Sequence, residues 1–203
     1  ASELSWRVSD PTGAVVAEGD EVADGTLDLP TTALGWYRLV VSVDGGAASA
    51  ETSFAVLPDR DAADSATGRF GAATHYGQSW STDSLPTLAT GGFAQLRDEV
   101  YWSEVETEKG VYDWARARAE FLDAARDAGV RPLLLAGYGN PLYDGGDGPV
   151  SDEAVSAYAA YAAAMATEFA DQASGIELWN EWDLGLGGNT HTSPEYYVNL
   201  LAA

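Results

Sequence analysis

The chain has 203 residues, of which 46% are hydrophobic and 21% are charged. This composition can bury a core and excludes a disordered chain. The 32 acidic residues outnumber the 10 basic ones, which gives a formal net charge of −22 at pH 7. Because phosphate groups are bound by clusters of Lys and Arg, this charge argues against nucleic acid and against an anionic membrane surface as partners. A high-salt habitat or a GC-rich genome would each produce such acidity, which carries no information about the fold.

The residue types that hold metals in proteins are scarce in this sequence. It has no cysteine and two histidines, His75 and His191, so disulfides, thiolate metal sites and a histidine-based zinc cluster are not expected. No apolar run approaches the ~20 residues that cross a bilayer, and we expect no membrane insertion. The chain begins at Ala1 without a methionine or an apolar signal segment, as a processed or trimmed chain would. We expect a secreted or cell-surface protein whose signal peptide is not part of these residues.

Residues 1–58 have the pattern of a small all-β module. Apolar and polar residues alternate in several short runs, separated by turn residues such as Asp, Gly and Pro. The predicted strands are residues 4–8, 14–16, 26–30, 35–43 and 52–57. Short strands with a turn about every 8–12 residues predict a β-sandwich. We expect Trp6, Trp36 and Tyr37 to pack in its core rather than to bind sugar.

The composition changes after Pro58. Residues 59–68 are small and polar and show no apolar periodicity, so we interpret them as a linker. In residues 69–203, buried strands alternate with helices, which is typical of a domain with a parallel sheet. The predicted strands are residues 70–74, 93–97, 130–136 and 176–179, and the predicted helices are residues 115–128, 151–171 and 195–203.

Polar side chains gather where these four strands end. The residues at or just past the strand ends are His75, Arg97, Asp98, Glu99, Tyr138, Asn140, Asn180 and Glu181. In a (β/α)8 barrel this face carries the active site, whereas in a doubly wound sheet such residues would gather at a switch point. No glycine-rich nucleotide-binding loop follows any of the strands, which argues against a nucleotide site.

Residues 175–185 carry the strongest chemical signal. Glu181 follows a short apolar strand and lies between Trp179 and Trp182 in the sequence. If the two indoles limit its hydration, the carboxyl group keeps its proton more readily, as a general acid must. Asn180 offers an amide that can hold a sugar hydroxyl. The alternative interpretation is a plain strand end, with Glu181 as an ordinary surface acid.

Three segments, in this order and spacing, resemble clan A retaining glycoside hydrolases, most closely the family 39-like branch. Residues 97–114 resemble the second strand of that barrel with its following loop, residues 135–144 resemble the third, and residues 177–181 resemble the fourth-strand motif. The resemblance covers residues 69–203, and residues 1–58 are similar to the β-sandwich module that often precedes such barrels. It implies a β-sandwich followed by an α/β domain of the (β/α)8 TIM-barrel type, truncated after about four β/α units.

The resemblance also implies roles for individual residues. Glu181 resembles the general acid/base, Asn180 the residue that bonds the sugar 2-hydroxyl, and Arg97 the arginine that lies beneath the nucleophile and holds it ionised. The implied substrate-binding residues are His75, Tyr138 and Asn140, with Trp102 and Trp182 as sugar platforms. Each of these five residues also fits a role in packing or in anchoring a loop.

One required group is missing from the pattern. A retaining mechanism needs a second carboxylate ~5–5.5 Å from the first as its nucleophile, and in this clan it comes from the seventh strand. The chain stops after the fourth strand, and neither Glu99 nor Asp183 occupies the matching position. An open half-barrel also leaves an edge and an apolar interior uncovered. We expect a longer protein or a second chain to complete the barrel, and residues 1–203 alone to be inactive.

The sequence thus predicts a glycoside hydrolase that acts on a polysaccharide or oligosaccharide and needs no metal or other cofactor. Two alternatives stay open. One is a non-catalytic carbohydrate-binding or scaffolding module that keeps the shape of the site. The other is a half-barrel that functions only by self-assembly.

Overall fold

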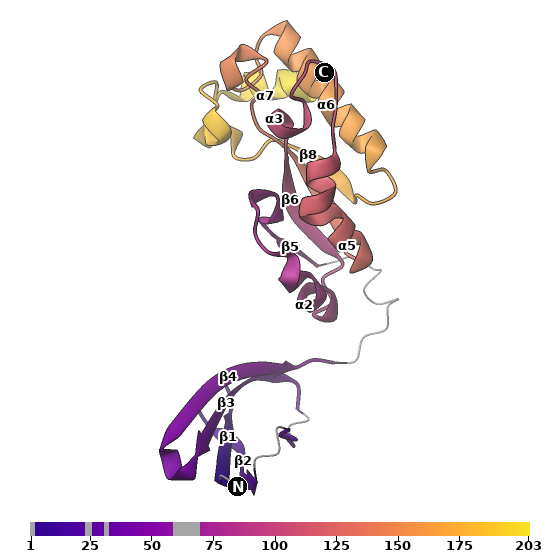
Figure 1. Cartoon of the computed structure of the whole chain (residues 1–203). Helices are drawn as coiled ribbons and strands as arrows, with labels where there is room; N and C mark the ends of the chain where they lie inside the picture. The colour runs from indigo at the N-terminus through magenta and orange to yellow at the C-terminus, as the bar shows by residue number, and fades with distance from the viewer. Residues whose placement is uncertain (1–2, 23–25, 31–32, 59–69) are drawn as a thin grey trace. The chain divides into compact units, whose positions relative to one another are not determined.

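The computed structural model describes residues 3–22, 26–30, 33–58 and 70–203. The chain divides into two compact units, Ala1–Asp59 and Arg60–Ala203 (Figure 1). Each unit has its own sheet and its own buried apolar cluster. The predicted linker, residues 59–68, lies outside the described residues.

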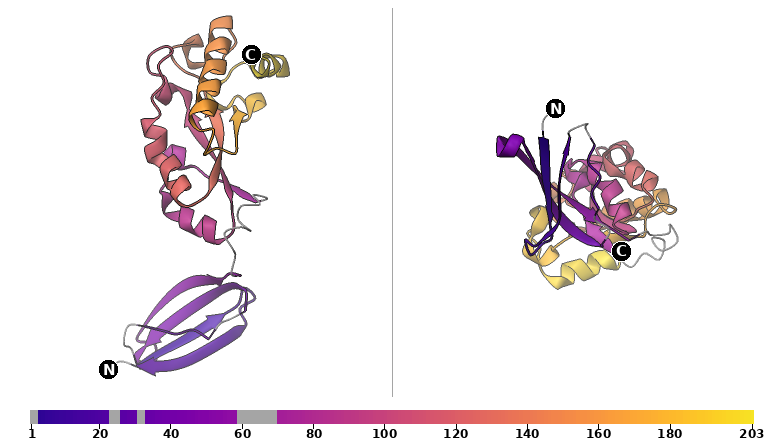
Figure 2. Two further views of the ribbon diagram at one scale, coloured as in Figure 1. Left: turned by 90° about the vertical axis from the view of Figure 1, so that its right-hand side faces the viewer. Right: turned by 90° about the horizontal axis from the view of Figure 1, so that it is seen from below.

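The first unit is built on a four-stranded antiparallel sheet in the order β2-β1-β3-β4 (Figure 2). Its strands are β1 (Glu3–Ser9), β2 (Val15–Val22), β3 (Gly35–Val43) and β4 (Ala48–Val56). Between β1 and β2 the Asp10 carboxylate accepts hydrogen bonds from the backbone N–H groups of Thr12 (2.9 Å) and Ala14 (3.0 Å). The 3-10 turn η1 (Asp44–Gly46) joins β3 to β4. Both connections use the turn residues that the sequence pattern indicates.

One face of this sheet is apolar and carries the core of the unit. Trp6 and Tyr37 are buried there, and Leu27 and Leu29 pack against them. Residues 26–30 show the predicted alternation in burial, but the predicted strand is wrong because this segment covers the core face without joining the sheet. The described residues of this unit form one sheet, so the second sheet of a β-sandwich stays a prediction.

Trp36 departs from the prediction that all three aromatic residues lie in this core. It is 47% exposed, whereas its neighbour Tyr37 is 6% exposed. Successive side chains of a strand point to opposite faces, so the burial of Tyr37 turns Trp36 outward. Trp36 therefore lies on the polar face of β3, which it shares with Arg38.

The second unit is built on a four-stranded parallel sheet in the order β5-β6-β7-β8, with the strands in chain order (Figure 1). Its strands are β5 (Gly71–Ala73), β6 (Gln95–Tyr101), β7 (Arg131–Gly137) and β8 (Gly175–Leu178). The helices are α2 (Leu85–Thr90), α3 (Trp102–Val105), α4 (Ala115–Ala117), the π-helical turn η4 (Arg118–Leu122), α5 (Asp123–Asp127), α6 (Asp152–Glu168) and α7 (Pro194–Leu201). Short 3-10 turns are η2 (Tyr76–Gln78), η3 (Thr82–Ser84), η5 (Asp144–Gly146), η6 (Trp182–Leu184) and η7 (Leu186–Gly188). The predicted strand–helix alternation and parallel sheet are confirmed, and the sheet is consistent with part of a barrel.

In the described residues, no helix combines the length and apolarity needed to cross a membrane.

Strand β6 is longer than predicted. It continues past residue 97 to Tyr101, which pairs with Gly137 of β7. Charged residues are rare inside parallel strands, which are covered on both faces. Asp98 is tolerated there because its carboxylate accepts hydrogen bonds from the buried N–H groups of Tyr76 (2.7 Å) and Gly77 (3.0 Å).

Helix α6 is tied to the sheet by two buried tyrosines. The Tyr161 hydroxyl donates a hydrogen bond to the Val100 carbonyl oxygen at 2.7 Å, and the Tyr158 hydroxyl donates one to the Ala136 carbonyl oxygen. Burial raises the pKa of both tyrosines, so both stay neutral donors. Two strands are thus held by one helix, which fixes the sheet that positions the site.

Substitution of Trp102 by alanine tests this description of the core. The Trp102 side chain is fully buried and stacks on Tyr143 at a centroid distance of 5.0 Å. We expect Trp102→Ala to lower the free energy of unfolding by about 3–5 kcal/mol, because it leaves a cavity. Urea unfolding measures the loss. Trp80→Ala is the matched control, since Trp80 is 64% exposed and its removal should change the free energy by about 0.5 kcal/mol at most. Equal losses would contradict the core position of Trp102.

Candidate active site

The candidate site begins on one face of strand β6. Side chains alternate along a strand, so Arg97, Glu99 and Tyr101 share one face. Leu96 and Val100 lie on the other face and are buried in the apolar core. The sequence of β6 thus separates a polar face from a packed face.

Arg97 makes a bidentate ion pair with Glu177 on β8. Its Nε lies 2.7 Å from Oε2 of Glu177, and its Nη2 lies 2.8 Å from Oε1. Because β7 lies between β6 and β8, the Arg97 side chain spans the middle strand. The hydrogen bonds to Glu177 are the main reason that the pKa of Arg97 is raised above its usual value.

Arg97 also fixes the side chain of Asn180. Its Nη2 donates a hydrogen bond to Oδ1 of Asn180 at 2.8 Å. A second hydrogen bond joins the Asn180 side chain to the hydroxyl of Tyr138. The structure therefore brings together three predicted site residues, Arg97, Asn180 and Tyr138.

Glu99 is a buried carboxylate on the same face. It is 7% exposed and accepts hydrogen bonds from Gln78 Nε2 (2.7 Å), the Tyr101 hydroxyl (2.8 Å) and the Tyr138 hydroxyl (3.0 Å). Burial first, and then the Glu99 charge, raise the pKa of Tyr138 to about 12. The pKa of Tyr101 is also raised, chiefly by burial. Both tyrosines keep their protons at neutral pH and donate hydrogen bonds to Glu99.

His75 lies at the rim of this network. Its Nδ1 is 3.1 Å from Gln78 Nε2, and its ring centroid is 5.2 Å from that of Trp80. A connected series of hydrogen bonds, called the polar network below, runs through His75, Gln78, Glu99, Tyr138, Asn180, Arg97 and Glu177. Four of these residues were predicted, and three were missed as site residues: Gln78, Glu99 and Glu177. Two signals could have found the carboxylates, namely the two-residue spacing of Glu99 from Arg97 and the charge of Glu177 in an apolar strand.

The backbone is strained where β8 ends. Trp179 has φ 63 and Glu181 has φ 51, in the left-handed region that bulky side chains rarely adopt. Such strain gathers at functional sites because the surrounding structure must hold it. Here it holds Trp179, which is 1% exposed, beside Tyr138 at a centroid distance of 5.4 Å. The turn thus separates a buried indole from an exposed Glu181.

Glu181 opens onto a groove instead of an aromatic pocket. The prediction that Trp179 and Trp182 wall it off from water is wrong, because Glu181 is exposed while both indoles are buried. The groove has a volume of 360 Å³ and is lined by Glu177, Leu178, Trp179, Glu181, Trp182, Asp183, Thr192, Pro194 and Tyr197. Glu177 belongs to the groove and to the polar network, so the two form one site.

Two predicted substrate contacts are structural instead. Trp102 is completely buried, so a sugar ring cannot stack on it. Asn140 is 1% exposed and donates hydrogen bonds to the carbonyl oxygens of Trp102 (3.3 Å) and Glu106 (2.8 Å). Asn140 therefore anchors a loop. Trp182 is 6% exposed and contributes to the groove wall.

Glu106 lies buried in the segment that follows β6. Its buried carboxylate accepts hydrogen bonds from Trp102 Nε1 (2.5 Å), the Gly110 N–H (2.6 Å) and the Tyr143 hydroxyl (2.6 Å). These contacts hold the loop that follows β6.

For the described residues, no group of three or more His, Cys, Asp or Glu side chains is placed to hold a metal ion.

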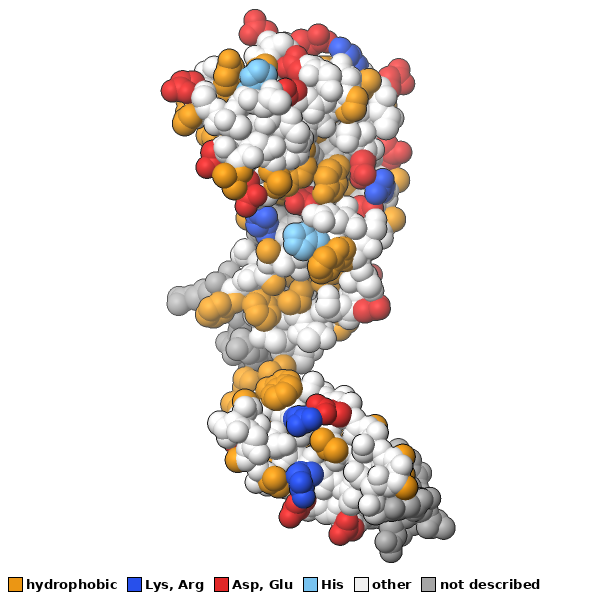
Figure 3. Space-filling view, turned by 90° about the vertical axis from the view of Figure 1, so that its left-hand side faces the viewer, with side chains coloured by type: hydrophobic (Ala, Val, Ile, Leu, Met, Phe, Trp, Pro, Cys, Tyr) orange, Lys and Arg blue, Asp and Glu red, His pale blue; other side chains and the backbone are white. Residues whose placement is uncertain are grey.

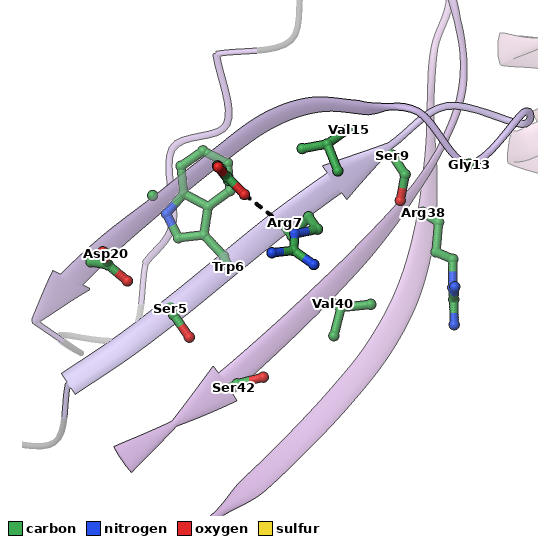
Figure 4. Close-up of a pocket in the computed structure, with 12 residues that line it drawn as sticks. Ser5, Trp6, Arg7, Ser9, Gly13, Val15, Asp20, Arg38, Val40 and Ser42 are labelled. Carbon is green, nitrogen blue, oxygen red and sulfur yellow. Dashed lines mark hydrogen bonds and ion pairs between the residues drawn. The ribbon is translucent and has the colours of Figure 1, made fainter. Parts of the chain in front are cut away.

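The first unit has a separate hollow of 730 Å³ on the polar face of its sheet (Figure 4). Its lining includes Arg7 and Arg38 with several serines. Arg7 pairs with Glu18 at 3.3 Å, and Arg38 pairs with Glu51. These ion pairs are exposed, and such pairs contribute little to stability. The second unit, with its buried and connected polar network, is therefore the better candidate.

Solved structures similar to this chain are glycoside hydrolases. A family 39 glycoside hydrolase from the gut symbiont Bacteroides cellulosilyticus WH2 has a TM-score of 0.71 and 25% sequence identity over 89% of this chain. The chain resembles glycoside hydrolases of family 39. The exo-beta-1,4-mannosidase Op5Man5 from Opitutaceae bacterium strain TAV5 has a TM-score of 0.50 and 25% identity over 66% of this chain. The glycoside hydrolase-like chain spans 38% of the length of the first enzyme and 29% of the second. No protein-family model and no curated protein matches the chain.

The Arg97–Glu177 pair of this glycoside hydrolase-like chain can be tested by its contribution to stability. We expect Arg97→Ala to lower the free energy of unfolding by about 1–3 kcal/mol, because it leaves a half-buried carboxylate unpaired. Arg126→Ala removes the same charge from an exposed pair with Asp123 on α5 and should cost about 0–1 kcal/mol. Urea unfolding of both variants measures the difference. An Arg97→Ala cost no larger than that of the control would show that the pair does not hold the sheet.

Proposed function

We propose that the protein is a glycoside hydrolase that cleaves O-glycosidic bonds in a polysaccharide or oligosaccharide by a retaining, two-carboxylate mechanism. The polar network carries this proposal. It places Arg97, Asn180 and Tyr138 in direct contact beside a groove that contains Glu181. The similarity to glycoside hydrolases of known structure supports the same reaction class.

Glu181 is the proposed general acid and base. It follows strand β8, so a rigid element holds its carboxyl group at the groove. General acid catalysis needs a carboxyl group within hydrogen-bond reach of the leaving oxygen, and an exposed carboxyl at a groove meets that need.

Asn180 is the proposed partner of the sugar 2-hydroxyl. Arg97 holds its Oδ1, so the amide NH2 group points away from the guanidinium and can donate. Tyr138 and His75 are proposed substrate contacts because each presents a polar group on the connected network. Trp182 is a proposed wall of the leaving-group side.

The nucleophile is proposed to lie outside residues 1–203. Both carboxylate oxygens of Glu177 accept hydrogen bonds from Arg97, so Glu177 is not proposed as the nucleophile. In the family pattern the nucleophile lies on a later strand of the barrel. A further segment of the same protein, or a second chain, would complete the barrel and supply it. Residues 1–203 alone should therefore bind sugar without turnover.

We also propose that the protein is secreted or displayed at the cell surface, where its glycan substrate would be found.

Glu181→Ala tests the proposed roles in the gene product that contains this chain. We expect the rate on a glycoside with a poor leaving group to fall ~10²–10⁴-fold, the usual contribution of general acid–base catalysis. An activated aryl glycoside, whose leaving group needs no proton, should lose much less in the glycosylation step. Added azide should restore the breakdown of the glycosyl-enzyme. Steady-state rates on both substrates measure these effects.

Glu168→Ala is the matched control, because Glu168 lies at the end of α6 and pairs with Arg118. Its rates should equal those of the unchanged protein. Equal losses on both substrates in Glu181→Ala, without rescue by azide, would take the role away from Glu181. Sugar binding with no turnover in the unchanged gene product would favour the non-catalytic carbohydrate-binding alternative.

A further inference from the structure

The polar network contains more negative than positive charge. Among its described residues, Arg97 carries the positive charge, and Glu99 and Glu177 carry two negative charges. Both donor groups of Arg97 that the network uses point to Glu177 and Asn180. Glu181 adds a third carboxylate at the groove. The described residues of this site therefore carry more negative than positive charge.

Among the described residues of the second unit, the basic side chains other than Arg97 make their printed ion pairs and hydrogen bonds outside the polar network. Acidic side chains are spread over both units on the face shown in Figure 3. The other basic side chains of the described part of the second unit are bound elsewhere: Lys109 to Glu153, Arg116 to Glu104 and Glu120, Arg118 to Glu168, Arg126 to Asp123 and Asp127, and Arg131 to the Ala173 carbonyl oxygen. None of these partners belongs to the polar network.

Glu99 is the buried carboxylate of the network, and the groups that donate hydrogen bonds to it carry no charge. Its three hydrogen-bond donors are an amide and two hydroxyls, all neutral. Neutral donors orient a carboxylate and leave its charge in place. A carboxylate has about four acceptor positions, so three donors leave one for a further donor. Because Glu99 is 7% exposed, solvent and salt screen its charge less than that of a surface acid.

We propose that Glu99 is a specificity-determining residue that admits neutral sugars and excludes sugars bearing a carboxylate or a sulfate. This inference rests on the proposed glycosidase function of the same site. A sugar hydroxyl can donate to the open acceptor position of Glu99, whereas an anionic substituent can only be repelled. The substrate class is then a neutral glycan, built from hexoses or pentoses without acidic groups.

Paired substrates test this assignment in the gene product that contains the chain. The pairs are an aryl glucoside with the matching glucuronide, and an aryl galactoside with the matching galacturonide. We expect kcat/KM for each uronide to be at least about tenfold below that of its neutral partner, as like-charge contacts discriminate strongly. Glu99→Gln should raise the uronide-to-neutral ratio about tenfold. This ratio does not depend on the fraction of folded enzyme.

Two control variants keep the test specific. Glu99→Asp preserves the charge and should preserve the ratio. Glu168→Gln makes the same charge change on α6, away from the network, and should leave both kcat/KM values unchanged. Binding of the same sugars, followed by tryptophan fluorescence, gives a second readout that needs no turnover.

The outcomes separate the two claims. Cleavage of neutral glycosides with an unchanged ratio in Glu99→Gln, or a preference of the unchanged protein for uronides, would overturn the role of Glu99 alone. Neutral sugars bound in preference to uronides, but cleaved by no variant, would support Glu99 and remove the hydrolase. Absence of both binding and turnover would overturn the two claims together.

Discussion

The ion pair between Arg97 and Glu177 is the interaction on which the rest of the site depends. It joins strands β6 and β8 across the intervening β7. The same guanidinium holds Asn180, and Asn180 is joined through Tyr138 to Glu99. Charge-assisted, two-pronged hydrogen bonds are among the strongest and most directional in proteins. One arginine thus links two strands of the sheet and orients the polar groups around it.

The packed side of the sheet supports this arrangement. Tyr158 and Tyr161 of α6 donate hydrogen bonds to strand carbonyl oxygens, and Glu106 and Asn140 hold the loops beyond the strands. Polar side chains are costly to bury unless their hydrogen bonds are satisfied, and each of these four side chains has a partner. The strained turn at Trp179 and Glu181 is held by this rigid frame, with the indole buried and the carboxyl directed to the groove. A fixed frame is what a catalytic carboxyl group requires.

Much of the second unit could be predicted because its signals are local. Apolar runs bounded by glycine and polar turns located the four strands, and strand-end placement located Arg97, Tyr138 and Asn180. The sequence could not reveal that Asp98 and Glu99 lie inside β6, since their partners Tyr76, Gln78 and Tyr138 come from other segments. It also misjudged two indoles: Trp102 and Trp182 carry the amphipathic ring of a sugar platform, and only tertiary packing shows that both are buried. In the first unit, alternation placed Leu27 and Leu29 against the core but could not show that residues 26–30 stay outside the sheet.

The structure of the gene product with a bound oligosaccharide tests the central claim most directly, because it locates the sugar relative to the network. The account predicts a glycosidic oxygen within about 3 Å of the Glu181 carboxyl group. The 2-hydroxyl of the sugar on the Arg97 side should contact the Asn180 amide, with the Arg97–Glu177 pair intact beneath it. A sugar seated instead in the hollow of the first unit, or one that leaves Glu181 and Asn180 without contact, would contradict it.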